Sequence, residues 1–466
     1  MVTVAEQTDV SLVRGRLILV VAAGLLLRLA LWWFNHDAAP QAGDAQDYDG
    51  IAARLAERGE FVSKSGRPTS IRPPLYPAFV ALIYRFAGMH NYAAVYAIQS
   101  LLNLATIWLV YRLGSAAYDR RVGLYAAVIF GFYPTFLAYE HLLLTEVLAT
   151  FLLTAAILAL VLGRARNELR LSATAGLLFG LAALTRSATL LLMPFAAVWI
   201  LCAWPETIRR RCVAAAIIIA AFAATIAPWS YRNTRVQDTF TMIDVMGGRN
   251  AMMGNYEHTP LERSWATIDI VEEERAWIRT LRETYPREFQ GGLSQGKIDK
   301  LAMRYALNFM REHPDLTLRR SLVKFFNFWQ LEREIVAEAE HGFFGLSGRT
   351  ALIASALLIC GYYAACLFAA VFGAVLKPPS DSALHALLIL CIAIPCAAHT
   401  LIFAHSRYHL PLVPLLAIYA ASAVVQRREI FARPGSPRFL AATAICVLLI
   451  CGWLRELLVV DLQRVL

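Results

Sequence analysis

Acidic and basic side chains stand close together in the polar segment 43–77, which follows the first apolar run of the chain. Asp44 and Asp47 are three residues apart, and Arg72 directly precedes two prolines, whose restricted backbone angles favour an extended, stiff presentation of the arginine. A carboxylate can remove the proton of a hydroxyl group, and a guanidinium can hold a phosphate. The segment therefore predicts a site for proton transfer beside a bound phosphate.

The two aspartates have a second interpretation as helix caps. They precede the helical pattern of Ile51 and Leu55, where acidic side chains satisfy free backbone N–H groups and interact favourably with the helix dipole. Glu146 opens a later apolar run and has the same two interpretations, a second functional carboxylate or a cap. Residue type and spacing leave both interpretations open.

The elements that must position these residues are membrane helices. With 58% hydrophobic and 17% charged residues over 466 positions, the sequence predicts an all-α polytopic membrane protein. The net charge of +10 could indicate nucleic-acid binding, but the basic residues gather in short clusters between apolar runs, which is the positive-inside pattern. We therefore predict membrane lipids as partners and no nucleic acid. The clusters are Arg14/Arg16, Arg120/Arg121, Arg164/Arg166/Arg170, Arg209 to Arg211 and Arg427/Arg428.

A first span at 17–34 follows Arg14 and Arg16, which places the N-terminus in the cytoplasm. It could be a cleaved signal peptide, but its apolar core is long for one, so the prediction is an uncleaved anchor. The apolar run 75–88 is shorter than the ~20 residues that a span needs, and it predicts a helix at the outer interface. About eleven spans, with the C-terminus outside, agree with every arginine cluster. They are 17–34, 91–112, 122–139, 146–163, 171–185, 188–204, 213–230, 350–376, 384–403, 408–426 and 439–454.

The spans divide the chain into three parts. Residues 1–230 form an N-terminal transmembrane module whose first outer loop, 35–90, carries the polar segment. Residues 231–349 are polar enough to form a small outer domain of helices, and residues 350–466 form a C-terminal transmembrane module. Within the outer domain, helices are predicted at 294–312 and 315–333, the second with an aromatic face that suits the membrane interface.

On this topology, further polar residues lie at the outer ends of the spans and therefore near the first loop. The eight cysteines all fall in or beside apolar runs, which favours buried small side chains over disulfides or metal ligands. The histidines show no zinc-binding spacing, so we predict no metal site and no certain cofactor, with dependence on a divalent cation left open. The further polar residues are Glu146, Arg186, Arg232, His405, Arg407 and Tyr408.

An ordered set of motifs resembles the GT-C superfamily of membrane glycosyltransferases, and within it the protein-mannosyltransferase-like and lipid A aminoarabinose transferase-like branch. The set runs through nearly the whole chain, although residues 256–345 carry little of it. The resemblance implies a GT-C-like bundle of helices with the active site on the outer face. The motifs are GDA-x-x-Y, RPPLYP, LLLTE, GLAALTR, PWSYRN with GGRN-x-x-x-GN, and RYHLPLVP.

The resemblance also implies roles for individual residues. Asp44 matches the catalytic aspartate of the family's first outer loop, and Glu146 matches a second acidic residue. Ala45 follows Asp44 where protein O-mannosyltransferases have an Asp-Glu pair, and the WWDYG-type motif of oligosaccharyltransferases is absent, so the acceptor class stays open. The predicted donor phosphate-binding residues are Arg72, Arg186, Arg232, Arg407 and Tyr408, with Asp47 and His405 as helpers.

We therefore predict a glycosyltransferase that moves a sugar from a polyprenyl-phosphate donor to a hydroxyl of an acceptor protein, lipid or glycan. A single displacement with inversion would take place at the periplasmic face of a bacterial inner membrane. The alternative is a transporter or flippase for lipid-linked sugars, which needs ionisable groups near the midplane that are reachable from both sides. Arg28 is nearly the only such group, and the other polar candidates lie on one side, so the transferase is favoured.

Overall fold

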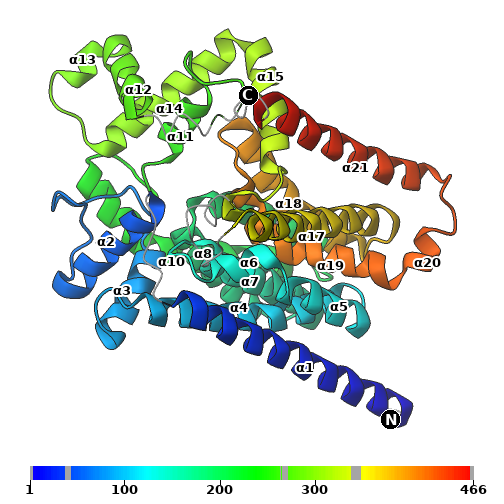
Figure 1. Cartoon of the computed structure of the whole chain (residues 1–466). Helices are drawn as coiled ribbons and strands as arrows, with labels where there is room; N and C mark the ends of the chain where they lie inside the picture. The colour runs from blue at the N-terminus through cyan, green and yellow to red at the C-terminus, as the bar shows by residue number, and fades with distance from the viewer. Residues whose placement is uncertain (1–3, 37–42, 263, 265–270, 337–347, 462–466) are drawn as a thin grey trace.

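The computed structural model describes residues 4–36, 43–262, 264, 271–336 and 348–461 (Figure 1). Across these ranges the chain is a bundle of helices, and no strand longer than an isolated bridge forms. Within the described ranges, eight helices are long and apolar enough to cross a membrane, which confirms the predicted all-α polytopic membrane fold. These candidate spans are Gly15–Asn35, Tyr92–Ala117, Glu146–Arg166, Ile208–Gln237, Arg349–Leu376, Ser382–Leu401, Ser406–Val425 and Pro437–Val459.

Three of the eleven predicted spans correspond to shorter helices. Two are the apolar helices Leu169–Thr185 and Ser187–Ala203, which are shorter than the eight candidate spans. The third, predicted at 122–139, is divided into α5 (Arg120–Gly131) and α6 (Pro134–Tyr139). The division has a local cause, because Pro134 has no N–H to continue a helix and instead begins a new one.

The predicted interfacial helix is α3 (Leu75–Ala87), whose 13 residues are too few to span. Helix α10 (Ile208–Gln237) continues past residue 230, so the predicted boundary between the first module and the outer domain lies inside one helix. The two outer helices predicted from sequence correspond to α14 (Gln295–Glu312) and α15 (Pro314–Phe328).

The outer helices form a cluster of their own. Figure 1 shows α12 (Val271–Thr284), α13 (Pro286–Phe289) and α14 grouped beyond the long helices, on the same side of the view as α2 (Asp44–Arg58). A separate apolar core joins α14 to α11 (Gly247–Gly254). It includes Met252, Tyr256, Trp277, Leu281 and Leu301.

Helix α7 (Glu146–Arg166) lies at the centre of the bundle, packed against α4 (Tyr92–Ala117) and α8 (Leu169–Thr185). Its neighbour α8 approaches α10 so closely that a Cβ at Gly176 would lie 2.3 Å from the carbonyl oxygen of Ile218. Small residues permit such contacts between membrane helices. The buried packing of α7 fixes the position of its first residue, Glu146.

The span α1 (Val4–Asn35) contributes a buried charge to the same region. Arg28 Nε donates to Glu140 Oε1 at 2.9 Å, and Asn103 donates to the same oxygen. Arg28 and Glu140 are 1% and 0% exposed. The pair ties α1 to the turn that leads from α6 into α7 and Glu146.

Candidate active site

Asp44 and Asp47 lie in the first turn of α2, yet neither carboxylate caps the helix. The capping position is Gly43, which has a positive φ of 84° and no side chain with which to cap. Both carboxylates bind Arg72 instead, since its Nη2 lies 2.6 Å from Asp44 Oδ1 and 3.0 Å from Asp47 Oδ2. Neither aspartate therefore serves as a side-chain cap, and both belong to an ion-pair network with Arg72.

Arg407 connects the first outer loop to the centre of the bundle. It lies on the 3-10 helix η4 (Ser406–Leu412), and its Nη2 is 3.1 Å from Asp44 Oδ2. Its Nε donates to Glu146 Oε1 at 3.0 Å. One guanidinium thus joins both carboxylates that were predicted to be catalytic, and the nearer of them in sequence, Glu146, is 261 residues away.

Arg186 completes the network and binds the same oxygen of Glu146 as Arg407 does. It lies between α8 and η1 (Ser187–Leu191), and its Nη1 donates to Glu146 Oε1 at 2.8 Å. Its guanidinium carbon lies 5.3 Å from the ring centroid of Tyr408, and that ring stacks on His399 at 4.3 Å. Glu146 also leaves its helix N-terminus uncapped, and its side chain is fully buried between the two arginines.

Charges balance within this cluster, because three arginines face three carboxylates. Arg72, Arg186 and Arg407 each keep between 14% and 17% of the side chain exposed. Each guanidinium can therefore contact a ligand while it holds a carboxylate. We refer to Asp44, Asp47, Glu146 and these three arginines as the arginine–carboxylate cluster.

The electrostatic state of Asp44 follows from its neighbours. Burial raises the pKa of this carboxyl, but the positive charges of Arg407 and Arg72 outweigh burial and hold the pKa well below its usual range. Asp44 is therefore ionised at neutral pH. An anion that shares the two arginines would weaken their hold and raise the pKa, which makes the carboxylate a better base.

Arg232 was predicted to bind the donor phosphate, and the structure places it outside this cluster. Its guanidinium donates to the backbone carbonyls of Thr69 at 2.6 Å and Phe61 at 3.0 Å. The same group lies 4.7 Å from the ring centroid of Trp229. These contacts anchor the first outer loop to α10, and they give no support to a phosphate-binding role.

His405 lies at the start of η4 and acts on the backbone. Its Nδ1 accepts from the N–H of Arg407 at 3.3 Å, which caps the short helix that presents this arginine. Its role as a helper in the reaction remains a prediction. Among the described residues, no group of three or more His, Cys, Asp or Glu side chains could hold a metal ion.

Sequence reasoning missed two carboxylates, Glu332 and Glu334, which line a small cavity together with Arg407. They fall in the part of the chain where the family motifs are weak, and no spacing rule singled them out. Their position in the chain could have indicated these glutamates, because they follow the aromatic helix α15 just before the chain returns to the membrane.

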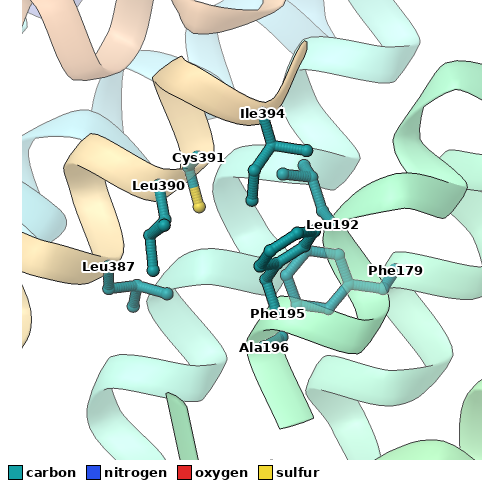
Figure 2. A pocket seen from close by; sticks show the side chains of 8 residues that line it. All are labelled: Phe179, Leu192, Phe195, Ala196, Leu387, Leu390, Cys391 and Ile394. Atoms are coloured by element: carbon teal, nitrogen blue, oxygen red, sulfur yellow. The ribbon is translucent and has the colours of Figure 1, made fainter. Parts of the chain in front are cut away.

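A small apolar pocket lies between the helices that lead away from Arg186 and Arg407. Figure 2 shows Leu192, Phe195 and Phe179 facing Cys391 and Ile394 across it. Phe195 belongs to α9 (Leu192–Ala203), which follows Arg186 and η1, whereas Ile394 belongs to α18 (Ser382–Leu401), which ends shortly before Arg407. The apolar pocket thus lies between two helices whose neighbouring chain segments carry Arg186 and Arg407.

Comparison with known proteins supports the resemblance drawn from the motifs. Residues 71–231, about a third of the chain, match the family model described as dolichyl-phosphate-mannose-protein mannosyltransferase. Arg72, Glu146 and Arg186 lie inside the matched range, whereas Asp44 and Arg407 lie outside it. A search among curated proteins finds no match to the sequence.

Solved structures of membrane glycosyltransferases are similar in fold. The archaeal oligosaccharyltransferase AglB from Archaeoglobus fulgidus, in complex with an inhibitory peptide and a dolichol-phosphate, matches with a TM-score of 0.54 and 15% identity. The match covers 95% of this chain and 55% of AglB, so the chain spans about half the length of that enzyme. ArnT from Cupriavidus metallidurans in the apo state matches with a TM-score of 0.42 and 13% identity, over 90% of this chain and 79% of ArnT. The family model and the AglB fold confirm the predicted resemblance to GT-C glycosyltransferases.

Proposed function

We propose that this protein transfers a sugar from a polyprenyl-phosphate donor to an acceptor hydroxyl, with the arginine–carboxylate cluster as its active site. The observation that carries the proposal is the position of Arg407, which contacts both Asp44 and Glu146. An arginine shared by a base and a buried carboxylate can hold a phosphate beside that base. The family model and the fold of the archaeal oligosaccharyltransferase support the same chemistry.

The donor would bind with its phosphate at Arg72, Arg186 and Arg407 and its polyprenyl chain in the apolar pocket of Figure 2. Guanidinium groups suit phosphate oxygens because each offers several N–H donors in a fixed plane. The pocket is small, but its apolar lining suits contact with the first isoprene units of the chain. The matched structure of AglB holds a dolichol-phosphate, a ligand of the same class.

The reaction would be one displacement. Asp44 removes the proton of the acceptor hydroxyl, and the acceptor oxygen forms a bond to the anomeric carbon. The bond between that carbon and the phosphate oxygen breaks, and the electron pair leaves with the lipid phosphate. The arginines stabilise the negative charge that develops on the leaving group. A single displacement inverts the configuration at the anomeric carbon, and the acceptor can be a protein, a lipid or a glycan.

The transporter alternative needs ionisable groups near the membrane midplane, and Arg28 was nearly the only candidate in the sequence. In the structure this arginine is buried in an ion pair with Glu140 and holds the turn before Glu146. This buried ion pair gives no support to a transport site at Arg28.

Arg72→Ala is expected to weaken binding of dolichyl phosphate to the purified protein by about 10- to 100-fold, because a charge-assisted hydrogen bond to the phosphate is lost. Arg72→Lys should restore part of the affinity, since an ammonium keeps the charge and loses the planar fork. Binding can be measured by isothermal calorimetry in detergent.

Arg232→Ala is the matched control for this measurement. Its contacts are to the loop carbonyls of Thr69 and Phe61, so thermal stability should fall while affinity changes little. Unchanged affinity in Arg72→Ala would reject the role of that arginine. Affinity lost equally in both variants would show that loop order, and no specific phosphate contact, decides binding.

We place the cluster at the outer face of the membrane, with the N-terminus in the cytoplasm and the active site facing the periplasm of a bacterium. Single cysteines at Ser65 and Gln290, which are both exposed, are then expected to react with an impermeant maleimide on intact cells. A cysteine at the exposed Ala432 should react only after lysis. The background protein lacks all eight native cysteines. The reverse labelling pattern would overturn the orientation.

A further inference from the structure

A buried histidine, His409, follows Arg407 on the same 3-10 helix, η4. Its side chain is 0% exposed, and its ring stacks on the rings of Tyr363 and Trp329, whose centroids lie 4.9 and 5.8 Å away. Tyr363 belongs to α17 (Arg349–Leu376), and Trp329 directly follows α15. The proposed reaction assigns no part to this histidine, although it lies in the helix that presents Arg407.

Both ring nitrogens of His409 have polar partners. Nδ1 lies 2.6 Å from the carbonyl oxygen of Phe328, and Nε2 lies 2.8 Å from Glu332 Oε1. A carbonyl oxygen can only accept, so Nδ1 carries a hydrogen. The contact between Nε2 and Oε1 has the length of a hydrogen bond and therefore needs a proton between these two atoms. His409 and Glu332 thus form a buried pair that shares one proton.

Glu332 connects this pair to a second element. The carboxylate is 3% exposed, and it accepts hydrogen bonds from the Tyr133 hydroxyl at 2.8 Å and from the Thr135 hydroxyl. These two residues flank Pro134, at which α6 begins. Helix α6 leads through a short turn to Glu146 at the start of α7. The pair therefore ties the helix that carries Arg407 to the segment that leads to Glu146.

Arg407 must hold one orientation to make the contacts of the arginine–carboxylate cluster. Its Nε donates to Glu146 Oε1 at 3.0 Å, and its Nη2 lies 3.1 Å from Asp44 Oδ2. Ordering a long side chain costs conformational entropy, and a fixed backbone leaves fewer conformations to lose. Arg407 and Glu332 line the same small cavity, so the pair lies next to this arginine. Without the pair, buried polar groups would lose their partners, which favours a shift of η4.

We infer that Glu332 and His409 are positioning residues that fix η4, so that Arg407 meets the donor phosphate in one orientation; the inference rests on the proposed function. Neither residue touches the reacting atoms, and both act through Arg407. Loss of the pair must therefore weaken phosphate binding only while Arg407 is present. A general contribution to folding would give no such dependence.

The test is a double-mutant cycle on the affinity of the full-length protein for dolichyl phosphate, measured by isothermal calorimetry in detergent. Glu332→Ala is expected to weaken binding about 10-fold, because a misplacement of about 1 Å is enough to lose much of the effect of a positioned group. In the Arg407→Ala background, the same substitution should change the affinity by less than about twofold.

His409→Phe tests the same pair with less loss of packing. Phenylalanine keeps a ring that can stack on Tyr363 and Trp329, and it removes both hydrogen bonds of the histidine. The variant should weaken binding as much as Glu332→Ala does, again without further effect in Arg407→Ala. Glu332→Gln should restore most of the affinity, because its amide can donate a hydrogen bond to Nε2 of a neutral His409.

Asp381→Ala is the control for a loss of stability alone. Asp381 caps the start of α18 and binds Arg164, whereas Arg407 follows the other end of that helix. We expect its thermal stability to fall while its affinity stays that of wild type. Equal weakening by Glu332→Ala with and without Arg407 would overturn the inference, as would wild-type affinity in folded His409→Phe. If Arg407→Ala binds dolichyl phosphate as tightly as wild type, the proposed function fails and the inference fails with it.

Discussion

Purified Asp44→Asn is expected to fold, to bind a lipid-linked donor and to transfer its sugar about 10²- to 10⁴-fold more slowly than wild type, because the amide cannot take the acceptor proton. Asparagine keeps the size of the side chain and can still accept a hydrogen bond from Arg72 or Arg407. Donor binding therefore survives while the proton acceptor is lost. Turnover, donor affinity and thermal stability measured on one preparation separate these effects.

Asp47→Asn is the matched control, since Asp47 lies one helical turn away and binds only Arg72 within the cluster. We expect its turnover to stay within about tenfold of wild type, below the range for a general base. If an aspartate acted only as a helix cap, its substitution would instead cost about 1 kcal/mol of folding stability and leave the rate of transfer unchanged. Near-normal turnover in Asp44→Asn would remove Asp44 from the reaction.

Arg407→Ala is expected to reduce transfer by at least about 10²- to 10³-fold, the effect of removing one group that stabilises developing negative charge. Unlike Asp44→Asn, it should also weaken donor binding, because the guanidinium would hold the phosphate before and during the reaction. The measurement is donor affinity and single-turnover rate for each variant.

The thermal stability of Arg407→Ala should fall as well. Glu146 is fully buried, and the substitution leaves it with Arg186 as its remaining arginine. Arg67→Ala, at an exposed arginine of the first outer loop, is the control for removal of one positive charge and should change neither property. Donor affinity and rate both near wild type in a folded Arg407→Ala would contradict the role that the cluster gives this arginine.

Composition and periodicity predicted most of the fold, because membrane helices can be recognised from the length and apolar content of a sequence segment. The outer helices at 294–312 and 315–333 were also visible, since their amphipathic patterns are local. The division of the span 122–139 was the main error. Pro134 was present in the sequence, but a proline can begin a helix or lie within one, as Pro228 does in α10. Tertiary packing decides between the two.

The sequence indicated most residues of the candidate site, but it did not indicate which of them contact one another. The sequence pointed to one site for Asp44 and Arg72 because both lie in the polar segment 43–77. The contact between Glu146 and Arg407 joins residues 261 positions apart, and only the packed bundle brings them together. Arg232 shows the limit of prediction from residue type, because a basic residue near the end of a predicted span can anchor a loop as readily as it can bind a ligand.

The central claim is that the protein cleaves the bond between lipid phosphate and sugar, and the fate of the sugar tests it most directly. Purified protein is placed in liposomes that contain dolichyl phosphate carrying radiolabelled mannose, glucose, galactose or arabinose. Bacterial envelope extract is supplied as the acceptor. The account predicts that wild type converts the lipid to dolichyl phosphate and moves the label to the acceptor, and that Asp44→Asn does not. Label that stays on the lipid for every sugar and becomes accessible in the opposite leaflet would contradict the account and identify a transporter.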